Sequence, residues 1–195
     1  MQELAELVTA RDSAVAEQTA LKNQLSAATG GFLKRQLKRR IERLDKDIDA
    51  LAQEILRRIE ADQGLARRYA ILTSIIGFGA VIAATLIAGL AELGTCSRKQ
   101  IGMLAGLAPI ADQSGERNGV RVIWGGRTAV RRSLYLAAMS AARHDPGMRI
   151  FFDRLKANGK HTKLALIAVA RKLVVLANTL VSENRLYAPT APVWA

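Results

Sequence analysis

A serine followed by arginines is the feature of this sequence with the clearest chemical potential. Ser114 stands between Gln113 and Gly115, so little side-chain bulk crowds its hydroxyl. Five arginines follow within 18 residues: Arg117, Arg121, Arg127, Arg131 and Arg132. Guanidinium groups near a serine can stabilise the charge that develops on a phosphorus under attack. No base adjoins Ser114, because His144 and His161 are distant in sequence, so an ordinary turn serine is the alternative interpretation.

Two glycines, Gly77 and Gly79, separate an apolar segment from a run of small residues. This pattern is typical of a helix-hairpin-helix, in which glycines let the backbone approach a phosphate and the next helix directs free amides toward it. Turns of this kind also simply connect packed helices. In so basic a chain we favour phosphate binding.

Clustered cations provide further candidate contacts to a nucleic-acid backbone. Lys34, Arg35, Lys38 and Arg39 begin a predicted helix, and their spacing places most of them on one side of it. A solvated helix face is the alternative. Further along the chain, Lys160 and Lys163 flank the predicted start of the last helix.

The composition favours an anionic partner. Lys and Arg number 29 against 17 acidic residues, giving a net charge of +12, and residues 71–195 hold 16 basic and six acidic residues. Aromatic residues are only 5%, which argues against platforms for base stacking. One cysteine and two histidines exclude an internal disulfide and a four-ligand zinc site, so we expect no cofactor in this chain and a reducing cytoplasm.

The pattern of apolar residues predicts a mainly α fold with a helical arm over residues 1–68. Gly30 and Gly31 divide this arm into two helices. The second helix carries a seam of coiled-coil spacing, made by Leu37, Ile41, Leu44, Ile48, Leu51 and Ile55. Two structures remain open: a hairpin that packs on itself, and an arm that joins copies of the chain into a homo-oligomer.

Residues 69–183 predict a helical domain, and residues 184–195 a loose tail. The domain would contain the helix-hairpin-helix, a small β-hairpin around Val120–Trp124, and helices that begin near Arg127 and Thr162. The uncharged run from Ile71 to Ala91 is long enough to cross a bilayer. Because Gly77 and Gly79 interrupt it, we expect a turn there and no membrane association.

Three motifs in order resemble a known family: Gly106-Leu107-Ala108-Pro109, Gln113-Ser114-Gly115 and Trp124-Gly125-Gly126-Arg127. With the preceding helices they are similar to the C-terminal part of the bridge-RNA-guided insertion-sequence transposases, over roughly residues 1 to 183. In that family a coiled coil and a second transposase domain follow a RuvC-like domain with a DEDD acidic set.

The resemblance implies that Ser114 is a nucleophile toward a DNA phosphodiester and forms a phosphoserine link that is later resealed. It also implies a guide RNA that bridges two DNAs, and magnesium held by the RuvC-like acids. The acidic residues of 1–70 cannot be assigned to that set, so magnesium is expected only with a RuvC-like domain. We therefore expect a truncated transposase, a degenerate copy or a separately encoded half, active in the bacterial cytosol or nucleoid. The alternative function is a non-catalytic helix-hairpin-helix module that binds DNA or RNA.

Overall fold

The computed structural model describes residues 1–108 and 126–188. These residues form eight α-helices and contain no strand. The helices divide into two compact units, Met1–Gln63 and Gly64–Ala195, whereas the sequence placed the boundary a few residues later, at 68/69. A mainly α fold is confirmed. The predicted β-hairpin around Val120–Trp124 lies outside the described residues.

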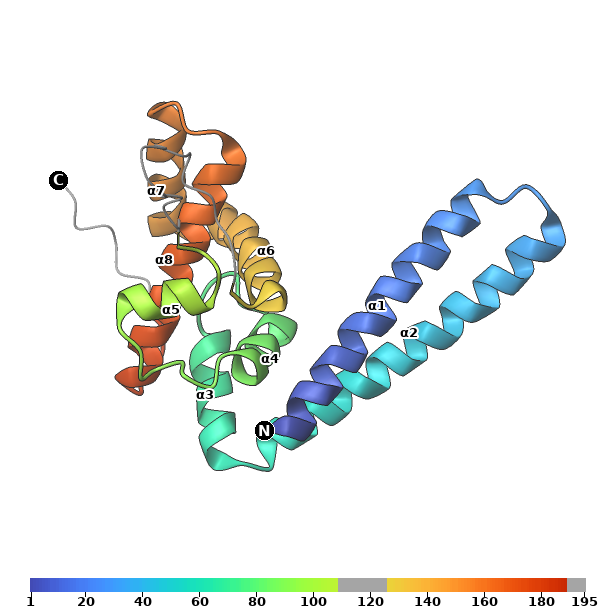
Figure 1. The fold of residues 1–195 in the computed structure, drawn as a ribbon, viewed down its shortest axis with the longest axis horizontal. Helices are drawn as coiled ribbons and strands as arrows, with labels where there is room; N and C mark the ends of the chain where they lie inside the picture. The colour runs from blue at the N-terminus through green and yellow to red at the C-terminus, as the bar shows by residue number, and fades with distance from the viewer. Residues whose placement is uncertain (109–125, 189–195) are drawn as a thin grey trace, which may run out of the picture. The chain divides into compact units, whose positions relative to one another are not determined.

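The first unit is an antiparallel helical hairpin of α1 (Gln2–Ala27) and α2 (Gly31–Glu60), joined at the two glycines (Figure 1). Near the joining loop, Leu21, Leu37 and Ile41 form a buried cluster. At the open end, Arg58 bonds Glu3 across the two helices at 2.6 Å. The hairpin therefore packs on itself, which was one of the two structures that the sequence left open.

The middle of the hairpin interface is polar. Gln18 is buried on α1 and donates a hydrogen bond from Nε2 to Asp45 on α2. Lys22 Nζ in turn donates to Gln18 Oε1 at 2.7 Å. Because the buried Gln18 side chain meets Asp45 in only one alignment of α1 and α2, this hydrogen bond favours that register of the two helices. Nearby seam residues Leu44, Ile48 and Leu51 are only half-buried.

The second unit is built around its last helix, α8 (Thr162–Ser182), which packs against α5 (Arg98–Leu104), α6 (Thr128–His144) and α7 (Pro146–Ala157) (Figure 1). Alanines on the facing sides, such as Ala137 and Ala170, are fully buried and let α6 and α8 approach closely. Among the described helices, α8 is the one long and apolar enough to cross a membrane, and half of its apolar window is buried. Its apolar composition is accounted for by its central place in this unit.

The uncharged run from Ile71 to Ala91 is divided, as predicted. It contains the end of α3 (Gln63–Thr73), a turn, and α4 (Ala80–Gly89). Gly77 in that turn has a φ of +98°, a conformation that L side chains rarely adopt, and Gly79 is the N-cap of α4. Two helices joined by a glycine turn are present, but this arrangement alone does not identify a DNA-binding helix-hairpin-helix.

The first residues after α8 are held against the second unit. Arg67 donates to the side-chain and main-chain oxygens of Asn184 at 2.8 and 2.7 Å. Tyr187 donates its main-chain N–H to Ser74 and its hydroxyl to the buried carboxylate of Asp145, at 2.6 Å. The expectation of a loose tail from residue 184 is therefore wrong for residues 184–187, because side chains distant in sequence hold them.

Candidate functional site

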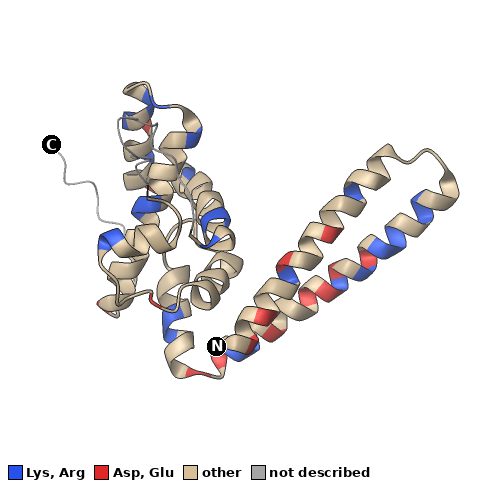
Figure 2. Cartoon of the chain, viewed as in Figure 1, with Lys and Arg blue, Asp and Glu red and all other residues tan. Residues whose placement is uncertain are grey.

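The second unit concentrates the positive charge of the chain. Residues 64–195 hold 18 basic and six acidic residues, whereas residues 1–63 hold eleven of each. In the described part of the unit, three of the four acidic side chains are already engaged. Glu92 pairs with Arg127, Glu183 pairs with Arg185, and Asp145 is buried in hydrogen bonds. In the described part of this unit, basic residues therefore greatly outnumber the acidic residues that could pair with them (Figure 2).

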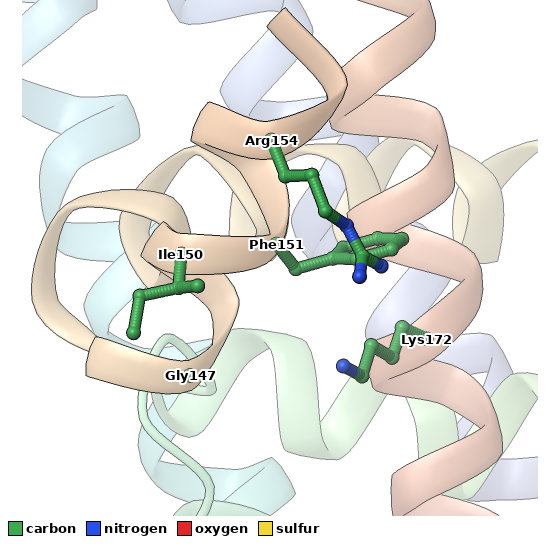
Figure 3. Close-up of a pocket in the computed structure, with 5 residues that line it drawn as sticks. All are labelled: Gly147, Ile150, Phe151, Arg154 and Lys172. Atoms are coloured by element: carbon green, nitrogen blue, oxygen red, sulfur yellow. The ribbon is translucent and has the colours of Figure 1, made fainter. Parts of the chain in front are cut away.

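A small pocket on α7 and α8 combines cations with an aromatic ring (Figure 3). Its cavity volume is about 170 Å³, and the described residues that line it are Gly147, Ile150, Phe151, Arg154 and Lys172. Lys172 Nζ lies 4.6 Å, and Arg154 Cζ 5.5 Å, from the centre of the Phe151 ring. Cation–π attraction over these distances holds both charges beside the cavity.

The local fold explains why these residues meet. Asp145 is the N-cap of α7 and accepts the main-chain N–H of Met148 at 2.9 Å, so α7 begins sharply after α6. Phe151 and Arg154 are three residues apart and share one face of α7. The packing of α7 on α8 then brings Lys172 to the same ring.

The pocket is suited to an anion. Among the described residues, the five that line it include two cations and no acidic side chain. The carboxylate of Asp145 lies beside Gly147, since its Oδ1 would be 3.4 Å from a Cβ added there. Both oxygens of Asp145 already accept hydrogen bonds, from Met148 and from Tyr187, and burial together with this bond raises the pKa of Tyr187. A phosphate group is of a size and charge that Arg154 and Lys172 can bind.

Arg127, predicted as a nucleic-acid contact, is engaged within the protein. Its two terminal nitrogens bond both oxygens of Glu92 at 2.7 Å each. The Arg127 guanidinium lowers the pKa of Glu92 to about 2, and the carboxylate raises the pKa of Arg127. This pair joins the segment after α4 to the beginning of α6, so Arg127 acts here as an anchor.

The main chain beside Arg127 is anchored too. Arg127 N–H donates to Leu104 O at 3.0 Å, and a Cβ added at Gly126 would lie 2.4 Å from the Cα of Gly106. The described chain before residue 109 and after residue 125 therefore comes together at Gly106 and Gly126. Ser114, Arg117 and Arg121 lie outside the described residues.

The two glycines of the predicted phosphate turn differ in their surroundings. A Cβ at Gly77 would lie 2.7 Å from Ala137 O and 3.1 Å from Ala141, so this position is closed by α6. Gly79 is exposed, and a Cβ there would have no heavy atom within 4 Å. Close packing against α6 accounts for Gly77, and only Gly79 has room for a ligand.

The remaining predicted contacts do not form one site. Lys34, Arg35, Lys38 and Arg39 are exposed on α2, in the first unit. In the second unit, the turn after α7 exposes Lys160, and the first turn of α8 exposes Lys163. Arg132 on α6 is exposed and Arg131 is half-buried.

Sequence reasoning missed the pocket residues Phe151, Arg154 and Lys172. The three-residue spacing of Phe151 and Arg154 was visible, but many surface helices carry such pairs. Lys172 joins them only through the packing of α7 on α8, which the sequence does not display. Over residues 1–108 and 126–188, no group of three or more His, Cys, Asp or Glu side chains is placed to hold a metal ion.

Comparison with known proteins identifies the central segment. Residues 69–153 match the model of the family described as "Transposase IS116/IS110/IS902 family". This segment is therefore similar to the transposase domain of that family. It contains α4, α5, α6 and the first residues of α7, including Phe151.

Individual relatives show the same similarity. "Insertion element IS900 uncharacterized 42 kDa protein" of Mycobacterium paratuberculosis is 28% identical over 187 residues, covering 93% of this chain and 44% of the relative. "Insertion element IS110 uncharacterized 43.6 kDa protein" of Streptomyces coelicolor is 30% identical over 125 residues, covering 63% of this chain and 31% of the relative. "Pilin gene-inverting protein" of Moraxella bovis is 28% identical over 143 residues, covering 71% of this chain and 44% of that protein. The chain spans less than half the length of each of these curated relatives.

Proposed function

We propose that this chain is a component of DNA transposition or site-specific recombination that binds nucleic-acid backbone through its second unit. The observation that carries the proposal is the family match of residues 69–153. The charge of the unit supports the proposal, because the unit holds 18 basic and six acidic residues. The pocket of Phe151, Arg154 and Lys172 would hold one backbone phosphate.

Ser114 is the proposed nucleophile. Its Oγ attacks the phosphorus of a DNA phosphodiester and forms a phosphoserine bond, while the bond from phosphorus to one deoxyribose oxygen breaks. The serine loses its proton, and the released deoxyribose oxygen gains one. A deoxyribose hydroxyl later attacks the phosphorus of the phosphoserine. The bond from phosphorus to Ser114 Oγ then breaks, the serine regains a proton, and a strand is resealed. Arg117 and Arg121 are proposed to stabilise the charge on phosphorus.

We propose two partners besides DNA. One is a guide RNA, which the resemblance to bridge-RNA-guided transposases implies. The other is a RuvC-like domain, which would bring the magnesium that the resemblance assigns to its acids; no step proposed for this chain uses that ion. The expected place of action is the bacterial cytosol or nucleoid.

A homo-oligomer formed through the hairpin is also proposed. Leu44, Ile48 and Leu51 are half-buried within one hairpin, so part of their apolar surface is available to a second copy. Replacing Leu44 and Ile48 with Glu should halve the mass measured by light scattering. An unchanged mass, whether monomeric or oligomeric, would contradict assembly through this seam.

Backbone binding is tested by measuring the affinity of the chain for duplex DNA across a series of salt concentrations. Each phosphate that the protein neutralises contributes about −0.9 to the slope of log affinity against log salt. We expect a steep slope and little dependence on DNA sequence. An affinity that stays flat from low to physiological salt would contradict the proposal.

The nucleophile is tested with the chain supplied with a RuvC-like partner, RNA and DNA. Ser114→Ala should still bind DNA but give no covalent adduct on a denaturing gel. An alanine variant as active as the parent would remove Ser114 from the mechanism.

A non-catalytic nucleic-acid-binding module is the second candidate. The observation in its favour is that the described residues lining the Phe151 pocket come from α7 and α8 and include two cations, which can bind a phosphate by charge alone. Salt-sensitive binding by the parent chain, with no adduct under any of these conditions, would favour this function.

A further inference from the structure

The charges of the hairpin are separated along its length (Figure 2). Between Gln18 and Ile41, around the loop, there are six Lys or Arg residues and no Asp or Glu. We call this part the hairpin tip. The rest of residues 1–63 holds five basic and eleven acidic residues. The net charge of the hairpin is therefore zero because a strongly positive tip is balanced by a negative remainder.

The cations of the tip form fewer ion pairs than those at the opposite end of the hairpin. Away from the tip, Arg57 and Arg58 both bond Glu54, and Arg58 also bonds Glu3. On the tip, Arg40 lies 3.4 Å from Glu17, with both side chains mostly exposed. Lys34, Arg35, Lys38 and Arg39 are exposed, and among the described residues no ion pair engages them. Lys34 and Lys38 lie one helical turn apart, as do Arg35 and Arg39.

An aromatic side chain stands beside these cations. Phe32, in the first turn of α2, is 69% exposed, and Leu33 is 51% exposed. The hairpin core next to them is complete without either residue, because Leu21, Leu37 and Ile41 fill it together with Leu25, Ala28 and Leu44. Packing within the hairpin therefore does not explain an exposed phenylalanine at its end.

We infer that the hairpin tip binds single-stranded nucleic acid or an unpaired loop, with Phe32 stacked on one base and Lys34, Arg35, Lys38 and Arg39 on the neighbouring phosphates. This inference rests on the proposed function, in that the chain acts on nucleic acid. An exposed base offers a flat apolar face with anionic groups on both sides, which matches a ring flanked by cations. A paired duplex would hide that face from Phe32.

Other occupants match the tip less well. The acidic part of a second hairpin would complement the cations, but its large exposed apolar side chains are few, namely Met1 and Leu56. Such a surface would leave Phe32 and Leu33 without a partner. An anionic membrane could take both, but it would repel the eleven acidic residues of the same hairpin.

The test measures affinity for a short single strand that contains the fluorescent base 2-aminopurine. Phe32→Leu keeps an apolar side chain and removes the ring, and Phe32→Trp restores a ring. We expect Phe32→Leu to weaken binding about fivefold to a hundredfold, in line with the loss of one stacked base, and to abolish the fluorescence change. Phe32→Trp should restore both.

The charge arm of the test compares two double variants. Lys34→Gln with Arg35→Gln should reduce the salt slope by about 1.4, since each single-strand phosphate contact contributes about 0.7. The matched control replaces Arg43 and Lys46, which lie on α2 beyond the tip, with Gln and should leave the slope unchanged. All four positions are exposed, so circular dichroism should show folded hairpins.

The outcomes separate this inference from the proposed function. If the parent chain binds neither single-stranded nor duplex nucleic acid, both are overturned. If the parent binds and both tip variants bind equally well, only the inference is overturned. Loss of binding in the charge variant alone overturns the stacking role of Phe32. Tip variants that alter the solution mass or vesicle binding while leaving nucleic-acid affinity intact would show that a second copy or a lipid surface occupies the tip.

Discussion

The hairpin and the second unit present positive charge in different ways. In residues 64–195 basic residues outnumber acidic ones three to one, and most of the described acids are engaged internally. In residues 1–63 the two signs are equal in number, and only their positions along the hairpin produce a basic end. The net charge of a unit is enough to identify the basic surface of residues 64–195. It does not identify the basic tip of the hairpin, where the net charge of the unit is zero.

The two units also differ in how they are stabilised. The second unit has a continuous core in which α8 contributes nine buried residues, whereas the hairpin interface is divided by the polar pair of Gln18 and Asp45. Substitutions should therefore be more costly in the second unit than at the seam of the hairpin.

Leu173→Ala should have the largest effect on stability. Leu173 is fully buried in α8, and its truncation should lower the free energy of unfolding by about 2–5 kcal/mol. Leu44→Ala removes the same atoms from a half-buried position in the hairpin and should cost clearly less. Denaturant unfolding followed by circular dichroism measures both. Equal losses would mean that the two units do not differ in this way.

The two glycines before α4 should respond unequally. Gly77→Ala forces a side chain into a φ of +98° and against Ala137 O, and we expect a loss of about 1–3 kcal/mol. Gly79→Ala should be nearly neutral or slightly stabilising, because Gly79 has a φ of −81° and open space around it. Thermal unfolding checks both variants. If the Gly79→Ala protein kept its stability but bound DNA more weakly, this would support a contact between the turn and a DNA phosphate.

The ion pair of Glu92 and Arg127 should give the smallest effect. Its carboxylate has a folded pKa of about 2 against an ordinary value of 4.5, so its stabilisation is present above 4.5 and is lost as pH falls toward 2. Glu92 is 38% exposed, so solvent screening keeps this contribution to about 1 kcal/mol or less.

Glu92→Gln should therefore reduce the stability difference between about pH 3 and about pH 6. Denaturant midpoints at the two pH values measure that difference. Replacing the exposed Asp153 with Asn provides the control, and an equal change in both variants would contradict the role of the pair.

Local patterns in the sequence predicted much of the fold. Gly30 and Gly31 correctly divided the hairpin. The start of α5 follows an equally local pattern, in which Ser97 is the N-cap and Gln100 completes the capping box. A helix was expected to begin near Thr162, and Thr162 is the first residue of α8, with His161 as its N-cap. Such signals act over a few residues, so they locate helix ends closely but not perfectly.

Tertiary contacts decided what the sequence did not reveal. The spacing of Gly77 and Gly79 resembled a phosphate turn, yet α6 closes one glycine and leaves the other open. Arg127 was grouped with other arginines, but Glu92, thirty-five residues earlier, engages it. The Phe151 pocket needed the packing of α7 on α8, and low aromatic content argued against stacking, although Phe32 is exposed at the hairpin tip.

The most direct test of the central claim is the salt dependence of duplex DNA binding in two charge-matched variants. One replaces Arg154 and Lys172 in the pocket with Gln, and the other replaces Arg43 and Lys46 on the hairpin. If the second unit binds backbone phosphate at the pocket, the first variant loses affinity and its salt slope falls by about 0.9 for the one phosphate held there. The second variant keeps the slope of the parent chain. Equal slopes for the parent and both variants would contradict the claim that this pocket holds a phosphate.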